Sequence, residues 1–145
     1  MTSSGSIELM APAGNFESLQ AALDNGADSV YFGVEQLNMR ARASINFTLD
    51  DLQEISDRCK KKNVRTYLTL NTIIYDHDLS IIKTLLDAAK KADITAVIAM
   101  DQAVIAYARQ IDMEVHISTQ INITNIETVK FYAMFADTMV LSREL

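Results

Sequence analysis

The amino-acid sequence predicts an α/β protein, a parallel (β/α) barrel of the TIM type that is incomplete within this chain. Two observations lead to this fold. Short β-rich runs alternate with helical patterns along the chain, and several of the runs alternate polar and apolar residues. We expect about six strands and five helices in one partial barrel domain, residues 7–145, behind a polar tail at residues 1–6.

Six short runs rich in β-branched and apolar residues are predicted as strands. In chain order they are Ile7–Met10, Ser29–Gly33, Val64–Asn71, Ala96–Met100, Glu114–Ile121 and Thr138–Ser142. Because a single helix separates each strand from the next, the strands must be parallel and joined by right-handed crossovers.

Five helices are predicted from apolar residues three or four positions apart and from capping residues at their ends. Their apolar stripes begin at Phe16, Leu49, Ile81, Val104 and Ile126. Asn25-Gly26 ends the first helix, and the other four begin behind Thr48 (with Asp51 three residues later), Asp78, Asp101 and Asn125.

The alternation within the third and fifth strands favours a barrel over an open sheet. Period-two geometry places Tyr67 and Asn71 on one face of the third strand, and His116, Ser118 and Gln120 on one face of the fifth. Polar groups cannot be packed under an apolar helix without losing their hydrogen bonds, whereas a barrel interior supplies water and ligand as partners. The alternative is an open sheet with one wet face.

A complete barrel of this type has eight strands and typically about 250 residues. With six strands, this chain is expected to be a fragment of a longer chain, or to be completed by neighbouring copies that associate through the open edges of the first and last strands.

Composition restricts the classes of partner. The net charge of −6 disfavours nucleic acid unless a local basic patch acts, such as Arg40 with Arg42 or Lys60 to Lys62. No apolar run approaches the roughly 20 residues that span a bilayer, so no membrane partner is expected. The start lacks a signal-peptide pattern and the single Cys59 excludes a disulfide framework, which predicts a cytoplasmic protein.

The reactive face of a βα barrel lies at the carboxyl ends of its strands, so these ends supply the candidate site. Gly14 and Asn15 are predicted to form a turn into the first helix. This turn could bind an anion at the helix N-terminus, or it could be purely structural, with glycine at a special dihedral angle. Arg40 and Arg42 lie in the long Val34–Phe47 connection and suit a carboxylate or phosphate, or else a solvated loop or an internal ion pair.

Polar residues at the other strand ends complete the candidate site. The catalytic candidates are Asn71, Asp101, His116, Ser118, Gln120 and Glu144, and further substrate-binding candidates are Asn122 and Arg143. Capping alone also explains Asp101. The expected ligand is a small anionic molecule or a peptide.

Several self-contained chemistries are absent from the sequence. It has neither the Gly-x-Ser-x-Gly of serine hydrolases nor the His-Glu-x-x-His of zinc peptidases. Cys59 lies on an apolar stripe and is expected in the core. His77 and His116 have no specific metal-ligand spacing, so no metal and no cofactor are expected in this chain.

Six segments, in order, resemble the collagenase-like peptidases of family U32. They are Glu8-Leu9-Met10-Ala11-Pro12-Ala13-Gly14-Asn15, Gly26-Ala27-Asp28-Ser29-Val30-Tyr31-Phe32-Gly33, Asn38-Met39-Arg40-Ala41-Arg42, Thr69-Leu70-Asn71-Thr72, His116-Ile117-Ser118-Thr119-Gln120 with Asn122 and Asn125, and Val140-Leu141-Ser142-Arg143-Glu144-Leu145. The resemblance covers the chain from Ile7 onward.

The resemblance implies two kinds of activity. Members of the family are named as proteases, and others are implicated in oxygen-independent hydroxylation of tRNA or ribosomal RNA bases or of a quinone precursor. Several hydroxylating members carry a cysteine-ligated iron–sulfur cluster in a segment that follows the Arg-Glu-Leu motif. If the chain is part of a hydroxylating enzyme, Arg40, Arg42 and Arg143 would hold an anionic cosubstrate. The iron–sulfur cluster and RNA binding would then belong to a longer parent chain. The third reading is a non-catalytic fragment that binds an anion or assembles with a partner.

Overall fold

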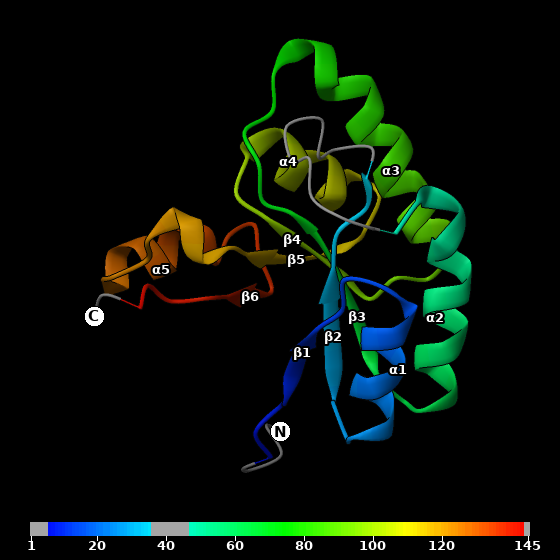
Figure 1. Cartoon of the computed structure of the whole chain (residues 1–145). Helices are drawn as coiled ribbons and strands as arrows, with labels where there is room; N and C mark the ends of the chain where they lie inside the picture. Colours follow the sequence, from blue (N-terminus) through cyan, green and yellow to red (C-terminus); the bar gives the residue numbers. More distant parts are fainter. Residues whose placement is uncertain (1–5, 36–46, 144–145) are drawn as a thin grey trace.

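The computed structural model describes residues 6–35 and 47–143, which form a curled parallel sheet with helices along its outer side (Figure 1). The strands are β1 (Met10–Pro12), β2 (Ser29–Phe32), β3 (Arg65–Leu70), β4 (Ala96–Ala99), β5 (Glu114–Ile117) and β6 (Thr138–Met139). They pair in the order of the chain, and every pair is parallel. A doubly wound sheet would interrupt this order, so the predicted incomplete barrel is confirmed.

Five α-helices connect the strands within the described part of the chain. They are α1 (Phe16–Asp24), α2 (Leu52–Lys61), α3 (Leu79–Lys91), α4 (Gln102–Gln110) and α5 (Ile126–Tyr132). Short 3-10 turns precede α2 and α3 and follow β5, namely η2 (Leu49–Asp51), η3 (Asp76–Asp78) and η4 (Thr119–Ile121). In the described ranges no helix is long and apolar enough to cross a membrane.

Side-chain caps fix where several helices begin. Asn125 accepts a hydrogen bond from the Thr128 amide at 2.9 Å, as the sequence predicts. Asp78 acts differently from the prediction, because its carboxylate accepts from the Tyr75 amide at 3.0 Å and so closes η3 rather than capping α3. The chain reaches α3 through a tight turn that this aspartate stabilises.

The hydrophobic core lies between the outer face of the sheet and the helices. Val30, Leu68, Val97 and Val115, from four neighbouring strands, are fully buried in this layer. The residues that alternate with them on β3 and β4 belong to a separate, smaller cluster around Tyr67 and face the inside of the curl. Each strand therefore buries one set of side chains under the helices and turns the other set inward.

Three strands differ from the prediction by more than one residue at an end. The first spans Met10–Pro12 instead of Ile7–Met10, the fifth ends at Ile117 instead of Ile121, and the sixth ends at Met139 instead of Ser142. After Ile117 the chain turns into η4 and reaches Asn122 in the left-handed conformation at φ 56°. Gln120 and Asn122 therefore do not continue the inward face of β5, and the predicted alternation beyond Ser118 is wrong.

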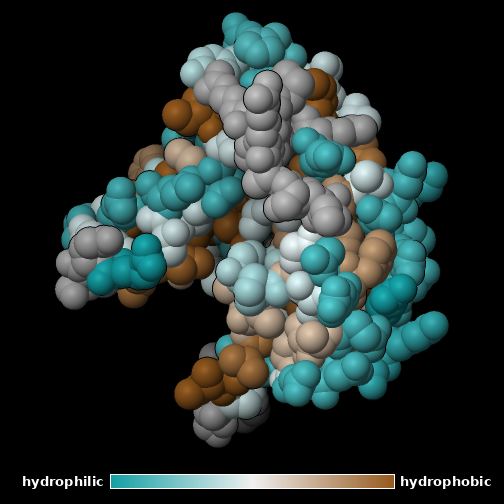
Figure 2. Space-filling model, viewed as in Figure 1, coloured by the Kyte–Doolittle hydropathy of each residue, from teal (hydrophilic) through white to brown (hydrophobic). Residues whose placement is uncertain are grey.

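The sheet is open on both sides in the part of the chain that is described. β1 pairs only with β2 and β6 only with β5, and Figure 2 shows the molecule hollowed between the N-terminal segment and α5. Large apolar side chains are exposed next to both edges: Ile7, Leu9, Met10, Ile126, Phe131, Met134, Phe135 and Leu141. Self-association through these edges remains a prediction.

Cys59 should be unreactive in the folded protein. It is fully buried in α2, and burial raises the pKa of its thiol to about 11, so both access and thiolate are lacking at neutral pH. We expect a thiol reagent at pH 8 to label Cys59 only in urea. Labelling in buffer at the rate seen in urea would contradict the buried position.

Candidate functional site

A network of charged and aromatic side chains occupies the inner face of the sheet. It joins residues from β3 and β5 to Glu8, which lies just before β1. The Arg65 Nη2 atom donates to Glu114 Oε1 at 2.8 Å, and its Nη1 atom lies 3.6 Å from Glu8 Oε2. Tyr67 donates its hydroxyl to Glu8. One arginine thus links the two carboxylates across the curl.

His116 is held in this network by two contacts. Its Nε2 atom lies 2.7 Å from Glu114 Oε1, and its ring packs against the Tyr67 ring with centroids 4.6 Å apart. His116 as a whole residue is only 5% exposed. With Glu114 ionised, the proton of a neutral imidazole sits on Nε2, and Nδ1, which has no hydrogen-bond partner among the described residues, keeps its lone pair.

The environment shifts the pKa values of three members, the acidic groups Glu8 and Tyr67 and the guanidinium of Arg65, whose pKa is raised. Burial raises the pKa of Glu8, but the hydroxyls of Ser29 and Tyr67 and the charges of Arg65 and His116 outweigh it, so the net shift is downward. The Ser29 hydroxyl acts through proximity, because it makes no hydrogen bond of ordinary geometry. Burial, followed by the bond to Glu8, raises the pKa of Tyr67, which therefore stays protonated.

Substitution of Glu8 by glutamine should make the free energy of unfolding depend less on pH under acidic conditions. Because folding lowers the pKa of Glu8, this residue stabilises the protein above its unfolded pKa of about 4.3, and the contribution is lost as the pH falls through the folded value. We expect urea midpoints between pH 6 and pH 3 to fall less steeply for Glu8→Gln than for the wild type. Identical slopes would show that the carboxylate has no such role.

The predicted site residues at the carboxyl ends of the strands differ in how deeply they are buried. Asn71 is half-buried after β3, and Ser118 is buried after β5, where its Oγ accepts weakly from the Gln120 amide at 3.3 Å. Gln120, Asn122 and Arg143 are exposed. His116 lies deeper than the rim, inside the curl. Arg40, Arg42 and Glu144 fall outside the described residues.

Asn15 and Asp101 are structural caps. Asn15 accepts from the Ser18 amide at 2.7 Å, and the neighbouring Gly14 has no positive φ, so the special dihedral suggested for it is not present. Asp101 accepts from the Ala103 amide at 2.8 Å and from the Ile74 amide at 3.1 Å. Each oxygen of Asp101 is therefore occupied, one by α4 and the other by the loop after β3.

Replacing Asp101 with alanine should lower the free energy of unfolding by about 1–2 kcal/mol, since it removes a helix cap and leaves the Ile74 amide without its acceptor. Urea unfolding measures the change. The exposed Asp50, in η2, provides a matched control that should change stability by no more than about 0.5 kcal/mol. Equal effects of the two substitutions would contradict the capping role.

Three members of the inner network were missed as candidates by sequence reasoning: Glu8, Arg65 and Glu114. Two of them could have been found from the period-two alternation that also predicts an inward-facing His116. Arg65 and Glu114 begin β3 and β5, and each lies two residues before the inward-facing Tyr67 or His116. Within the described ranges, no group of three or more histidine, cysteine or acidic side chains is arranged to hold a metal ion.

Comparison with known proteins places the chain in a family. The sequence model of peptidase family U32 matches residues 14–145. The chain is 56% identical over 138 residues to a protein named collagenase from Porphyromonas gingivalis, covering 95% of this chain and 33% of that protein. It is 34% identical to tRNA hydroxylation protein P1 of Bacillus subtilis, covering 94% of this chain and 33% of that protein.

A solved structure agrees with the fold. The U32 peptidase Mk0906 superposes with a TM-score of 0.73 at 14% identity, covering 97% of this chain and 61% of that chain. The present chain spans about one third of the length of the curated relatives described above.

Proposed function

This chain belongs to peptidase family U32, and we propose that it forms part of the active-site wall of a peptidase. The proposal is supported by the identity to the collagenase-named relative and rests, within the structure, on one observation. A buried histidine is held by a carboxylate on the inner face of the sheet, with its other ring nitrogen free of partners among the described residues.

In this proposal His116 is the general base of peptide hydrolysis. Nδ1 takes a proton from a water molecule as the water oxygen attacks the peptide carbonyl carbon, and the same proton is later given to the departing amine. Glu114 is a positioning residue, because its bond to Nε2 fixes the ring and stabilises the imidazolium that forms. Arg65 keeps Glu114 in place from the other side at 2.8 Å.

A serine nucleophile fits the geometry less well. Ser118 lies only two residues beyond His116, but its hydroxyl accepts from the Gln120 amide and makes no hydrogen bond to the imidazole. Nucleophilic catalysis by serine needs a base within hydrogen-bond reach. A water nucleophile therefore agrees better with the described side chains.

Binding of the peptide is assigned to the strand ends. Asn71 and Arg143 lie at this rim, and Arg40 and Arg42 remain predicted partners for a substrate carboxylate. This assignment places the anionic end of a peptide at the mouth of the curl and the scissile bond further inside.

The purified protein should be assayed on gelatin and on a set of fluorogenic peptides. The proposal expects cleavage of at least one peptide, with new amine ends detected by mass spectrometry. Absence of any cleavage, together with hydroxylated nucleosides that depend on the protein in cellular tRNA, would instead establish the second candidate function.

That second candidate is a part in hydroxylation of RNA, supported by the 34% identity to the tRNA hydroxylation protein. It agrees with the predicted cytoplasmic location, although the net charge of −6 works against RNA binding. The residues of this chain do not fit an iron–sulfur cluster, because the only cysteine, Cys59, is fully buried in the core. The ligands of such a cluster would have to come from outside these 145 residues.

A further inference from the structure

The inner network carries more negative than positive charge while His116 is neutral. Among the described residues, its carboxylates are Glu8 and Glu114, and its guanidinium is Arg65. The imidazole of His116 lies 2.7 Å from Glu114 Oε1, and it supplies a second positive charge when it is protonated. Two cations then face two carboxylates, so the charges of the network balance only when the imidazolium has formed.

One carboxylate oxygen is shared between the two cationic groups. Glu114 Oε1 accepts from Arg65 Nη2 at 2.8 Å and lies 2.7 Å from His116 Nε2. On its other side, Arg65 has Nη1 3.6 Å from Glu8 Oε2, which is the distance of an ion pair rather than of a hydrogen bond. Arg65 is therefore divided between two carboxylates, and Glu8 limits how far the guanidinium neutralises Glu114.

Glu8 and His116 are also coupled through their charges. Burial raises the pKa of Glu8, but hydroxyl groups together with the charges of Arg65 and His116 outweigh it, so the net shift is downward. Electrostatic coupling between two titrating groups is reciprocal. An ionised Glu8 therefore favours the protonated imidazole by the same free energy by which the imidazolium favours ionised Glu8.

The other side chains around His116 are apolar, hydroxyl-bearing or phenolic. His116 is paired in register with Ile98 of β4 and Thr138 of β6. Tyr67 of β3 packs against the ring and stays protonated, because burial, followed by its bond to a carboxylate, raises its pKa. Tyr31 of β2 packs against the small cluster around Tyr67. In the described part of the chain, the charged groups that face the imidazole are therefore the three network members named above.

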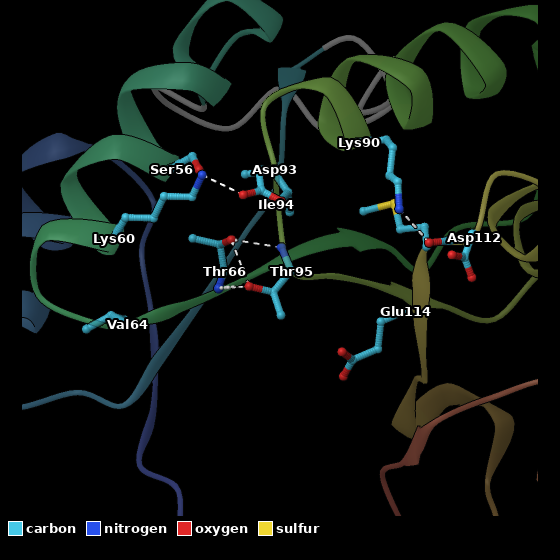
Figure 3. A pocket seen from close by; sticks show the side chains of 11 residues that line it. Ser56, Lys60, Val64, Thr66, Lys90, Asp93, Ile94, Thr95, Asp112 and Glu114 are labelled. Atoms are coloured by element: carbon cyan, nitrogen blue, oxygen red, sulfur yellow. Dashed lines mark hydrogen bonds and ion pairs between the residues drawn. The ribbon is translucent and has the colours of Figure 1, made fainter.

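Glu114 also lines a cavity at the amino-terminal ends of the strands, whose lysines are engaged elsewhere (Figure 3). Lys60 Nζ lies 2.6 Å from Asp93 Oδ2. Lys90 Nζ donates to the Asp112 carbonyl oxygen at 2.6 Å. Figure 3 shows the Glu114 carboxylate apart from both pairs. The lysines of the cavity therefore do not take the place of the guanidinium at Glu114.

We propose that Glu8 is a positioning residue that, together with Arg65, sets the proton affinity of His116. By engaging the guanidinium, Glu8 preserves the negative charge of Glu114, and its own charge adds to the stabilisation of the imidazolium. Both effects make His116 a stronger base. The catalytic role of Glu8 rests on the proposed function, in which His116 is the general base, whereas the coupling itself exists without a substrate.

Titration of the two histidines by nuclear magnetic resonance tests the coupling without a peptide. The chain has only His77 and His116, and the exposed His77 pairs with Asp78 outside the network, so it is an internal reference. Glu8→Gln should lower the titration midpoint of His116 by roughly 0.5 pH unit or more and leave His77 in place. Arg65→Gln removes a cation and should raise the His116 midpoint.

Glu17→Gln is the matched control, because it removes the same charge from an exposed position on α1. It should move the His116 midpoint by no more than about 0.1 pH unit. Glu8 is itself exposed, so its variant should fold, and an amide spectrum with the dispersion of the wild type checks this. An unchanged or raised His116 midpoint in Glu8→Gln, or an equal shift in Glu17→Gln, would overturn the proposal.

Peptide cleavage separates the coupling from the proposed function. If the protein cleaves a peptide, the acid limb of kcat/KM should move to lower pH in Glu8→Gln by the same amount as the His116 midpoint, with KM little changed. A midpoint that moves in a protein that cleaves no peptide would support the coupling and reject only the peptidase activity. An acid limb that stays in place while the midpoint moves would reject His116 as the base.

Discussion

The His116→Gln variant is expected to lose about 10²–10⁴-fold in kcat/KM on a peptide substrate, which is the usual contribution of a general base. Glutamine keeps a polar side chain in the wall but cannot take up a proton at neutral pH. The loss should appear in kcat, because the substrate is bound at the rim rather than by the imidazole. Steady-state kinetics on the best fluorogenic peptide measure both constants.

Two companion variants separate catalysis from structure. Glu114→Gln should reduce kcat by less than His116→Gln and displace its pH profile, since it alters the partner of Nε2 and leaves the base in place. Ser118→Ala should keep most of the activity, because its hydroxyl is not bonded to the imidazole. Full activity of His116→Gln, or complete loss with Ser118→Ala, would reject the assignment.

Replacing Leu68 with alanine should lower the free energy of unfolding by about 2–5 kcal/mol. Leu68 is fully buried at the centre of β3, on the face that packs under the helices. Truncation leaves a cavity between the sheet and the helices. Urea unfolding monitored by circular dichroism measures the change.

Ile73→Ala is the control for this substitution. Ile73 follows the same strand but is 63% exposed, so the same kind of truncation should cost no more than about 0.5 kcal/mol. A loss below about 1 kcal/mol for Leu68→Ala would mean that this face of β3 is not the core face.

The overall fold could be predicted because its signals are local. Alternation along the third strand separates Leu68 from Tyr67, and this alone determines which face meets the helices. Caps such as Asn125 act within three residues of the helix start. Neither feature depends on distant parts of the chain.

The end of the fifth strand could not be predicted in the same way. Polar residues at every second position look alike in a strand and in a turn, so Gln120 and Asn122 were expected to continue the face of His116. The left-handed backbone at Asn122 and the 3-10 turn before it redirect them to the surface. Asparagine tolerates the left-handed conformation but also adopts others, so its presence in a sequence does not identify such a turn.

Long-range pairing limited the prediction of the site. Arg65 and Glu114 are 49 positions apart, and nothing in the local pattern says which acid an inward-facing arginine will meet. The curl of the sheet brings β1, β3 and β5 around one interior, in the way that alternate strands share a layer in complete barrels. The sequence shows which residue types face inward, but which of these side chains lie in contact depends on the tertiary fold.

The shared polar interior depends on the inward direction of alternate residues of β3 and β5, and nuclear Overhauser contacts between the Tyr67 and His116 rings test it most directly. With centroids 4.6 Å apart, the two rings should give strong cross-peaks that disappear in His116→Gln. Cross-peaks from the imidazole to methyl groups of Val104 on α4, with none to Tyr67, would place His116 under the helices and contradict this interior.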